Sequence, residues 1–537
     1  MKYIKNKFLS IALVTGVLTV ILFTACDKGF EEMNVNPNAY TEPSLAPLFT
    51  TSIIRTVGTG TADRNRVNIK FLSGAMQYHA TLQNFWYGEK GIVNSQSGNF
   101  FETVYSTHLR NLSIVIDKTN GKDDLVNQNA IAKIWWIYAI HRVTDAYGDV
   151  PYKEAVQGSI SGLYKPVYDK QSDIYPLMLQ DLEAAIAKLD PAKASFGAPD
   201  VIYGGNVAKW KTFGYSLMLR LGMRLTKVDP ALAETWVKKA IAGGVMQSNA
   251  DLAKLTHAST SGNTWNWDAS ELKRESLPES GKGLGLVKMG KPFIDLLILN
   301  NDPRLSFYAT LWEGNILSKQ IQVISQTTLP ALQKGLPNGY DAGTIGTVIP
   351  GWSNSMLTSY SEMNTATIAN LSTPSIILSY SEVEFLLAEA AMRGWETTVT
   401  PEIHYQKAIR ANMESTTLFP FSNIAPMEIT ATEINDYLAG HTLAGTFNDK
   451  MNQIHSQFYL AHYMYLDFFE AWSNWRRTGY PDILTPINYV LNSTGGATIR
   501  RLMYSFDEKA LNVVNYEAAV ANQGPDTYMT RVWWDKQ

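Results

Sequence analysis

The sequence predicts a mainly α-helical fold in which antiparallel helix pairs of the tetratricopeptide kind form a scaffold interrupted by loop-rich insertions. Helical periodicity recurs in three paired segments, near residues 130–190, 206–244 and 375–415. Each pair spans roughly 40 residues, which lies in the range of helical repeats. The stretch near residues 250–373 lacks this periodicity and is rich in Gly, Ser, Thr, Asn and Trp. We expect irregular loops and short strands there, within a single domain that covers residues 45–537.

The first pair shows apolar residues at helical spacing on both of its helices. The first helix carries this stripe at Ile131, Ile134, Trp135 and Tyr138. Gly148 and Pro151 predict its end, because glycine and proline interrupt helices. The second helix carries a matching stripe at Ile174, Leu177, Met178, Leu182, Ala185, Ile186 and Leu189. Two such stripes bury each other when the helices pack side by side.

The other two pairs show the same pattern with clearer boundaries. The first helix of the second pair has an apolar face made of Trp210, Phe213, Leu217 and Leu221. Pro230 suits the first turn of its partner helix, and Gly243 and Gly244 predict where that helix ends. The third pair is formed by the segments SIILSYSEVEFLLAEAAMRGW and PEIHYQKAIRANMES.

An Ala-Ile dipeptide occurs at a matching point in the second helix of every pair, at Ala185, Ala240 and Ala408. A small residue lets two antiparallel helices approach closely, and the large residue beside it fills the remaining space. This shared position indicates that the three pairs are related units.

Residues 1–25 are expected to be a lipoprotein signal peptide. Three lysines among the first seven residues precede an uncharged apolar run over residues 8–23. This run is shorter than the ~20 residues of a membrane-spanning helix and is typical of an export signal. The sequence FTAC resembles a lipobox, in which the cysteine is acylated and becomes the first mature residue. We expect Cys26, the only cysteine, to carry the lipid, so that no disulfide or thiolate site remains.

The mature chain is expected to be attached to a membrane through this lipid. Residues 26–44 are polar, rich in Asn and Pro and aperiodic, which predicts an extended tether. Several acyl chains at one point give stable anchoring, whereas a single chain binds only weakly. Removal of the signal peptide, which contains three lysines, changes the formal charge of the chain from −3 to −6. A nucleic-acid partner would require a basic surface, so this acidic charge argues against one.

Residues of the kinds that catalyse reactions occur, but their placement favours structural roles. Five carboxylates lie in predicted helices, at Glu382, Glu384, Glu389, Asp467 and Glu470. Glycosidases use a carboxylate pair, yet helix capping, solvated faces or ion pairs with nearby arginines explain these positions more simply. The nearby arginines are Arg393, Arg410, Arg476 and Arg477. His455 and His462 lack an evident third metal ligand. We expect no enzyme activity, no catalytic metal site and no cofactor. Whether the loops hold a structural cation stays open.

Aromatic residues among Gly, Asn and Ser are better candidates for ligand binding. The chain contains 14 Trp and 27 Tyr, a composition often seen in proteins that bind sugars. Pyranose rings stack on aromatic rings, although Trp and Tyr also fill large helical cores. Three clusters lie outside the helical stripes, and their members are Phe85, Trp86, Tyr87, Trp265, Trp267 and Trp352. Trp265 and Trp267 are two residues apart, so in an extended loop both would point to one side.

A series of motifs, taken in order, resembles the SusD/RagB family of nutrient-binding outer-membrane lipoproteins of Bacteroidetes, in its starch-binding branch. The similar segments run from CDKGFEEMNVNPNAYTEP behind the lipobox to RVWWDK at the end. Between them lie RVTDAYGDVPYKEA, WKTFGYSLMLRLGMRLTKVDP, NNDPRL, YSEVEFLLAEA, EAWSNWRRTGYP and RRLMYSFDEKALN. Each segment alone is only weakly specific for the family. Together they occur in the family's order and extend over nearly the whole chain.

The resemblance implies a right-handed superhelix of tetratricopeptide repeats with an irregular remainder. It implies a protein that is anchored in the outer membrane, faces the cell surface and caps a SusC-type TonB-dependent transporter. It further implies capture of a glycan or another nutrient and its delivery to the transporter without chemistry. The motif residues Asp302, Arg304, Arg476 and Arg477 are expected to hold helix ends and turns, so no ligand-binding residue follows from the resemblance.

Two other functions stay open. A surface glycoside hydrolase would degrade a polysaccharide and lose all activity on removal of one carboxylate. A helical-repeat scaffold would bind protein partners and show no affinity for soluble glycans. A binding subunit would instead hold a glycan with a dissociation constant of about 10⁻⁶–10⁻³ M, through loop aromatics.

Overall fold

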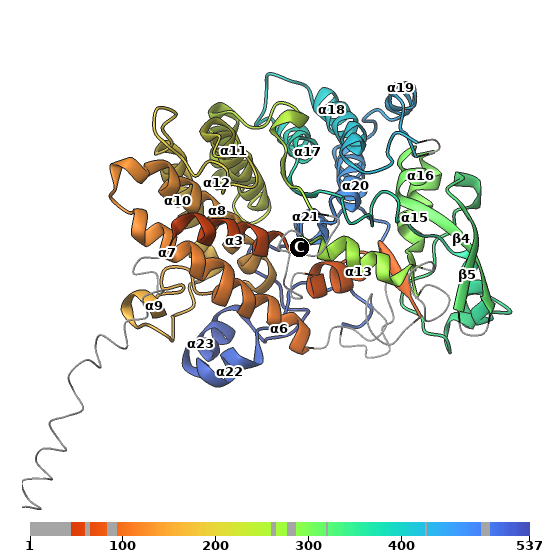
Figure 1. Cartoon of the computed structure of the whole chain (residues 1–537), viewed down its shortest axis with the longest axis horizontal. Helices are drawn as coiled ribbons and strands as arrows, with labels where there is room; N and C mark the ends of the chain where they lie inside the picture. The colour runs from red at the N-terminus through yellow and green to blue at the C-terminus, as the bar shows by residue number, and fades with distance from the viewer. Residues whose placement is uncertain are drawn as a thin grey trace, which may run out of the picture. The chain divides into compact units, whose positions relative to one another are not determined.

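The computed structural model describes residues 44–58, 65–82, 94–258, 265–276, 286–317, 320–424, 427–484 and 494–537. The predicted signal peptide, Cys26 and nearly all of the predicted tether lie outside these residues. Residues 46–537 form one compact unit, and helices dominate its described part, as predicted. Figure 1 shows the two longest strands, β4 (Ala309–Leu317) and β5 (Gln320–Thr327), on the right.

Short helical segments lead into the first predicted pair. In chain order they are α3 (Leu45–Val57), η1 (Asn65–Leu72), α5 (Ser73–Ala75), α6 (Asn94–Thr103), η2 (Val104–Leu109), α7 (Arg110–Thr119) and η3 (Asp123–Leu125). Helix α7 packs against α8 (Val126–Tyr147). The main hydrophobic core begins with Phe49 and Ile53 of α3 and includes Leu112 and Val115 of α7.

The three predicted helix pairs are confirmed. The first is α8 with α10 (Gln171–Ala187), and the second is α11 (Val207–Arg224) with α12 (Pro230–Gly243). The third is α17 (Tyr380–Met392) with α18 (Pro401–Glu414). Successive pairs also pack together, through α10 on α11 and α11 on α17. Figure 1 shows the pairs following one another from α10 on the left to α18.

Local sequence explains where these helices begin and end. The side chains of Asn206 and Asp229 accept backbone hydrogen bonds in the first turns of α11 and α12. Pro230 occupies the first turn of α12, as predicted. Gly244 ends α12 at a φ of 97°, a conformation that glycine adopts without steric cost.

Small residues let the helices approach closely, in agreement with the shared Ala-Ile dipeptide. Ala185, Ala240 and Ala408 are all buried. At Gly214 of α11, a Cβ atom would lie 2.6 Å from Cγ1 of Ile186 on α10. This separation is too short for a non-bonded carbon pair, so glycine permits the observed crossing of the two helices.

The loop-rich segment contains short antiparallel strand pairs, as predicted, but more helix than predicted. Within the segment, β4 pairs with β5 and with β6 (Glu362–Met363). Its other two strands pair with strands outside it, β3 (Val287–Met289) with β1 (His79–Thr81) and β2 (Ala253–Leu255) with β7 (Ser375–Leu378). The helices are α13 (Trp267–Glu275), α15 (Lys291–Leu299) and α16 (Arg304–Tyr308), and the 3₁₀ turns are η4 (Asn249–Asp251), η5 (Pro330–Leu332), η6 (Ile345–Thr347) and η7 (Asn354–Ser359). The hypothesis of loops and short strands alone was incomplete, because so short a helix gives too few turns for its period to stand out.

Further helices complete the described part of the chain. They are α9 (Gly158–Ser161), η8 (Ser415–Leu418), α19 (Ala431–Gly440), α20 (Phe447–Tyr465), α21 (Phe468–Thr478), α22 (Phe506–Leu511) and α23 (Val513–Gln523). Helix α20 packs against both α17 and α21 and so joins the third pair to the C-terminal region. Within the described ranges, none of the helices has the length and apolar character needed to cross a membrane.

Buried ion pairs connect helices that are far apart in the sequence. Arg220 of α11 donates to the carboxylate of Glu382 on α17 at 2.6 and 2.7 Å. Arg224, one turn later, donates to both oxygens of Glu470 on α21 at 2.8 Å. All four side chains are at most 4% exposed. Paired charges of this kind fix which helix positions face each other, because an unpaired charge in the core is very costly.

The motif residues that the resemblance assigned to structural roles have such roles. Arg304 donates to both carboxylate oxygens of Asp302, and both side chains are fully buried. Arg476 donates to the backbone carbonyl oxygens of Asp145 and Arg500. These contacts hold chain turns and helix ends within the protein itself.

Candidate functional site

Trp352 lies on a small apolar platform in the loop-rich segment, which we call the loop platform. Its buried residues are Ala80, Leu82, Leu336, Ile345, Leu357 and Tyr360, against which Tyr340, Ile349 and Trp352 pack. The rings of Trp352 and Tyr360 are 6.0 Å apart, and Nε1 of Trp352 donates to Oδ1 of Asn354 at 3.3 Å. The Trp352 indole is only partly buried, so it offers a fixed aromatic surface to a ligand.

A cavity of about 600 Å³, which we call the loop cavity, adjoins the loop platform. Its lining consists of Lys291, Pro292, Asp295, Leu296, Leu299, Pro337, Asn338, Tyr340, Val348 and Ile483. Tyr340 belongs both to this lining and to the loop platform. The volume and the mixture of apolar side chains with a few polar groups are typical of small-ligand pockets. The loop platform and the loop cavity together form the candidate ligand site.

Trp265 and Trp267 do not have the arrangement that the sequence suggested. Trp267 is the first residue of α13 and is 39% exposed, whereas Trp265 precedes the helix in a bridge with Ala258. Asn266 caps α13 by accepting a hydrogen bond from the N–H of Ala269. The cap turns the chain between the two tryptophans, so the extended-loop geometry was wrong. Neither residue lines the loop cavity, and their roles in ligand binding stay predictions.

The third aromatic cluster, Phe85, Trp86 and Tyr87, lies outside the described residues. Leu82 of the loop platform is the last described residue before this cluster. Ligand binding by these three residues stays a prediction, and so does acylation of Cys26.

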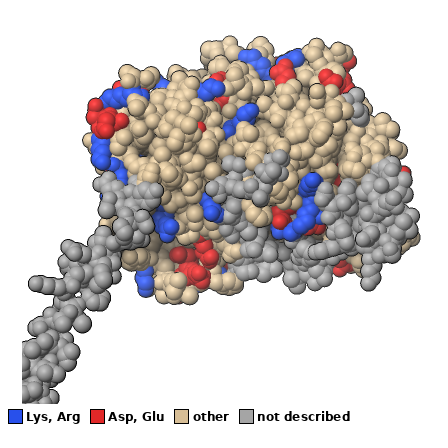
Figure 2. Space-filling view, in the orientation of Figure 1, with Lys and Arg blue, Asp and Glu red and all other residues tan. Residues whose placement is uncertain are grey.

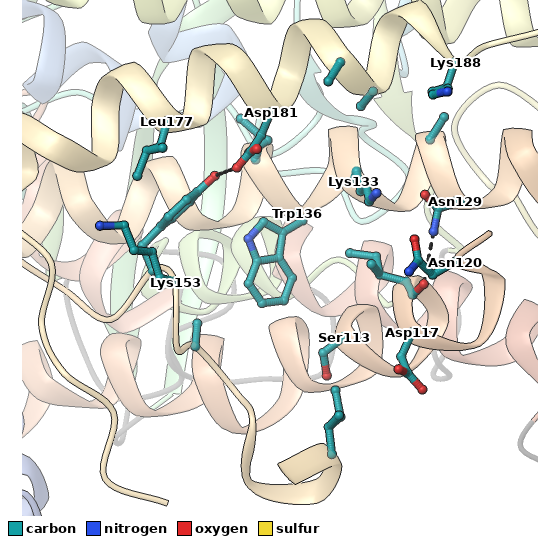
Figure 3. Close-up of a pocket in the computed structure, with 18 of the residues that line it drawn as sticks. Ser113, Asp117, Asn120, Asn129, Lys133, Trp136, Lys153, Leu177, Asp181 and Lys188 are labelled. Carbon is teal, nitrogen blue, oxygen red and sulfur yellow. Dashed lines mark hydrogen bonds between the residues drawn. The ribbon is translucent and has the colours of Figure 1, made fainter. Parts of the chain in front are cut away.

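A second cavity, of about 720 Å³, lies between α7, α8 and α10, and we call it the helix cavity. Trp136 of α8 points into it, as Figure 3 shows. The neighbouring Trp135 is fully buried in the core, and successive helix residues point about 100° apart. Trp136 was not among the candidate residues predicted from the sequence. A large aromatic residue beside the apolar stripe of its helix was the signal that could have found it.

Glu389 illustrates how the candidate catalytic carboxylates are held. It accepts hydrogen bonds from Arg477 at 2.8 and 2.7 Å and from Arg393 at 2.9 and 2.7 Å. Its carboxylate also lies 3.0 Å from Nε2 of His455. Burial raises the pKa of Glu389, but Arg477 and His455 outweigh burial and hold it well below its usual range. The group therefore stays ionised and cannot act as a general acid at neutral pH.

The other four carboxylates are also buried and paired. Glu382 pairs with Arg220, Glu384 with His404, Asp467 with Arg142 and Glu470 with Arg224. Burial raises the pKa of Glu382, but Arg220 and His462 outweigh it and lower the pKa to about 2. A glycosidase needs carboxyl groups that reach the substrate, whereas these side chains are buried against their partners.

The predicted arginine partners were only partly right. Arg393 and Arg477 do pair with Glu389. Arg410 approaches Glu414 at 3.8 Å instead, and Arg476 donates to backbone carbonyl groups. The arginine partners of Glu382, Asp467 and Glu470 come from helices more than 150 residues away in the sequence, which the spacing of neighbouring residues does not indicate.

His455 and His462 face carboxylates and are buried. Nε2 of His455 lies 3.0 Å from Glu389, and Nε2 of His462 lies 3.4 Å from Glu382. Across the residues that the structure describes, no group of three or more His, Cys, Asp or Glu side chains is placed to hold a metal ion.

Charged side chains are scattered over the face of the molecule shown in Figure 2, where Lys and Arg alternate with Asp and Glu. A nucleic-acid-binding surface requires Lys and Arg clustered in a continuous basic patch. The face in view has no such patch among its described residues.

The observed architecture defines a class, a tetratricopeptide-like helical-repeat protein with loop-rich insertions. Residues 37–505 match the family described as starch-binding associating with outer membrane, and the chain belongs to this family. Among curated proteins, none matches the sequence.

Solved structures agree with this assignment. A chitin-binding protein is similar at 30% identity and a TM-score of 0.77, over 92% of this chain and 100% of its own. A SusD-like protein of Bacteroidetes is similar at 23% identity and a TM-score of 0.78, over 92% and 100%. A chitin-binding SusD homologue from Flavobacterium johnsoniae is similar at 23% identity and a TM-score of 0.74, over 92% and 99%. The fold of this chain is therefore SusD-like.

Proposed function

We propose that this protein is a nutrient-binding lipoprotein of the outer membrane, which captures a glycan and delivers it to a SusC-type TonB-dependent transporter without catalysis. The observation that carries the binding role is the partly exposed Trp352 on the loop platform, beside a cavity of about 600 Å³. Family membership supports a carbohydrate as the ligand. The paired, buried carboxylates support a role without hydrolysis.

Oligosaccharides of N-acetylglucosamine are the first ligands to test. The relative at 30% identity is a chitin-binding protein. The indole of Trp352 is suited to stack against the C–H face of a pyranose ring, and polar groups of the loop cavity, such as Asn338, can bond its substituents. Other glycans of similar ring shape should be compared beside them.

In this proposal, the lipid on Cys26 determines where the protein lies in the cell. Acylated Cys26 anchors the chain in the outer membrane, facing the cell surface, and residues 26–44 hold the folded part away from the lipid. A tagged full-length chain, purified from native membranes in mild detergent, should bring a large outer-membrane barrel with it in stoichiometric amount. Recovery of the protein alone, or with soluble enzymes, would contradict delivery to a transporter.

Binding is tested by affinity electrophoresis on glycan-containing gels, with Trp352→Ala as the variant. Truncation of a stacking aromatic residue costs about 1–3 kcal/mol, so the dissociation constant should rise about 5- to 150-fold. Trp395→Ala is the matched control, because Trp395 is also partly buried but packs against the main core at the end of α17. Equal retention of wild type and Trp352→Ala would contradict a binding role for the loop platform.

A further inference from the structure

The helix cavity has the size and the mixed lining of a ligand site, although it lies within the helical scaffold. It has a volume of about 720 Å³, within the range of small-molecule pockets. Helices α7, α8 and α10 and the chain near residues 152–160 line it. It is separate from the loop platform: η7, which follows Trp352, packs beside β4, and Figure 1 shows β4 on the right and α10 on the left.

Trp136 provides the aromatic surface of the helix cavity. It is partly buried, packs against the main core and directs its indole into the cavity, between Asp181 on one side and Lys133 on the other (Figure 3). Among the described residues, its Nε1 has no hydrogen-bond partner. An indole fixed in this way presents a flat apolar surface together with an available N–H donor.

Polar groups surround this indole and can both donate and accept hydrogen bonds. Lys133 lies one helical turn before Trp136 and has no ion-pair partner in the described part of the chain. Asp117, near the end of α7, lies 3.9 Å from Nζ of Lys118, and both of these side chains are about half exposed. Asp181 of α10 accepts a hydrogen bond from the hydroxyl of Tyr152 at 2.6 Å, which fixes its carboxylate at the cavity wall.

The charges of the lining are balanced, which favours a neutral ligand. Three lysines and two aspartates line the helix cavity. One of the lysines, Lys153, pairs with Asp169 at 3.3 Å, outside the lining. Two lysines and two aspartates then remain, so the cavity has no excess charge to attract a phosphate or another anion.

We propose that the helix cavity is a second saccharide-binding site, in which a neutral pyranose ring stacks on Trp136. Its hydroxyl groups donate to Asp117 and Asp181 and accept from Lys133. This inference rests on the proposed glycan-binding function but concerns a different site. Two sites on one molecule would let separate units of a long oligosaccharide, or two chains, bind at the same time.

The test uses a chitohexaose that carries a photoreactive diazirine, followed by mass spectrometry of the labelled peptides from the full chain in detergent. Wild type should be labelled both on peptides of α7, α8 or α10 and on peptides near the loop platform. Trp136→Ala should reduce the label on α7, α8 and α10 about tenfold, while Trp136→Phe, which keeps a flat ring, should retain most of it. Trp352→Ala should leave this label unchanged.

Controls separate loss of binding from loss of folding. Asp117→Ala removes a half-exposed carboxylate, so it should keep the wild-type melting temperature and still reduce the label in the helix cavity. Trp395→Ala should change neither label. Label confined to the loop platform, or label on α8 that persists in both Trp136→Ala and Asp117→Ala, overturns the second site and leaves the proposed function intact. No label anywhere, together with no retention on any glycan gel, overturns both.

Discussion

Replacement of Glu389 by glutamine should remove a large part of the stability of the fold. Glu389 is the common partner of Arg477, Arg393 and His455. Arg477 is 1% exposed, so water cannot compensate its charge once the carboxylate is gone, whereas Arg393, at 23%, can turn toward solvent. Leaving one member of a buried ion pair without its partner costs about 3–5 kcal/mol. We expect Glu389→Gln to lower the free energy of unfolding by this amount.

The assay is urea denaturation at neutral pH, followed by tryptophan fluorescence, on a soluble chain that begins after Cys26. Glu234→Gln is the matched control, because Glu234 and Lys238 pair on the surface of α12, with side chains 41% and 54% exposed. Surface pairs of this kind contribute about 0.2–1 kcal/mol. If Glu389→Gln costs no more than the control, the assignment of Glu389 as the compensating charge for Arg477 is refuted.

Three further outcomes are expected. The folded-state pKa of Glu382 is about 2 and its ordinary value is 4.5, so its contribution to stability is complete above about pH 4.5 and is lost as the pH falls toward 2. As the pH is lowered from about 6 to 2.5, the melting temperature of Glu382→Gln should therefore fall less steeply than that of the wild type. Parallel curves for the two proteins would contradict this. Gly214→Ala should lower the melting temperature because its Cβ would lie 2.6 Å from Ile186, whereas Gly346→Ala, which meets open space, should not; equal effects would argue against the close helix crossing. Cys26→Ser should move the protein from the membrane fraction to the soluble fraction, and unchanged fractionation would exclude acylation as its anchor.

The long helices could be predicted from the sequence because each presents its period over several turns. The pairs near 130–190, 206–244 and 375–415 follow from apolar stripes, and Pro230 and Gly244 marked their boundaries correctly. The short helix α15 was missed, because its nine residues give little more than two turns. Local patterns thus define long elements and leave short ones ambiguous.

The candidate site could be predicted only in part, since binding surfaces depend on contacts between distant segments. Ligand binding by Trp352, predicted from its Gly-, Asn- and Ser-rich surroundings, stays a prediction, and the structure adds the apolar platform against which Trp352 packs. The position of Trp136 in the wall of the helix cavity did not follow from the sequence, because Trp136 directly follows the core residue Trp135 and only the folded structure separates their environments. The partners of Glu382 and Glu470 were missed for the same reason, because Arg220 and Arg224 come from a helix more than 150 residues earlier.

The buried ion pairs between α11, α17 and α21 affect how this scaffold responds to force. In an ordinary tandem repeat each unit contacts only its neighbours, so the array bends and stretches like a spring. Here Arg224 bonds to Glu470, 246 residues further along the chain, so that α11 and α21 cannot separate without exposing both charges. The helices joined in this way should therefore move as one rigid piece. Loops attached to them would keep their spacing when the scaffold is pulled.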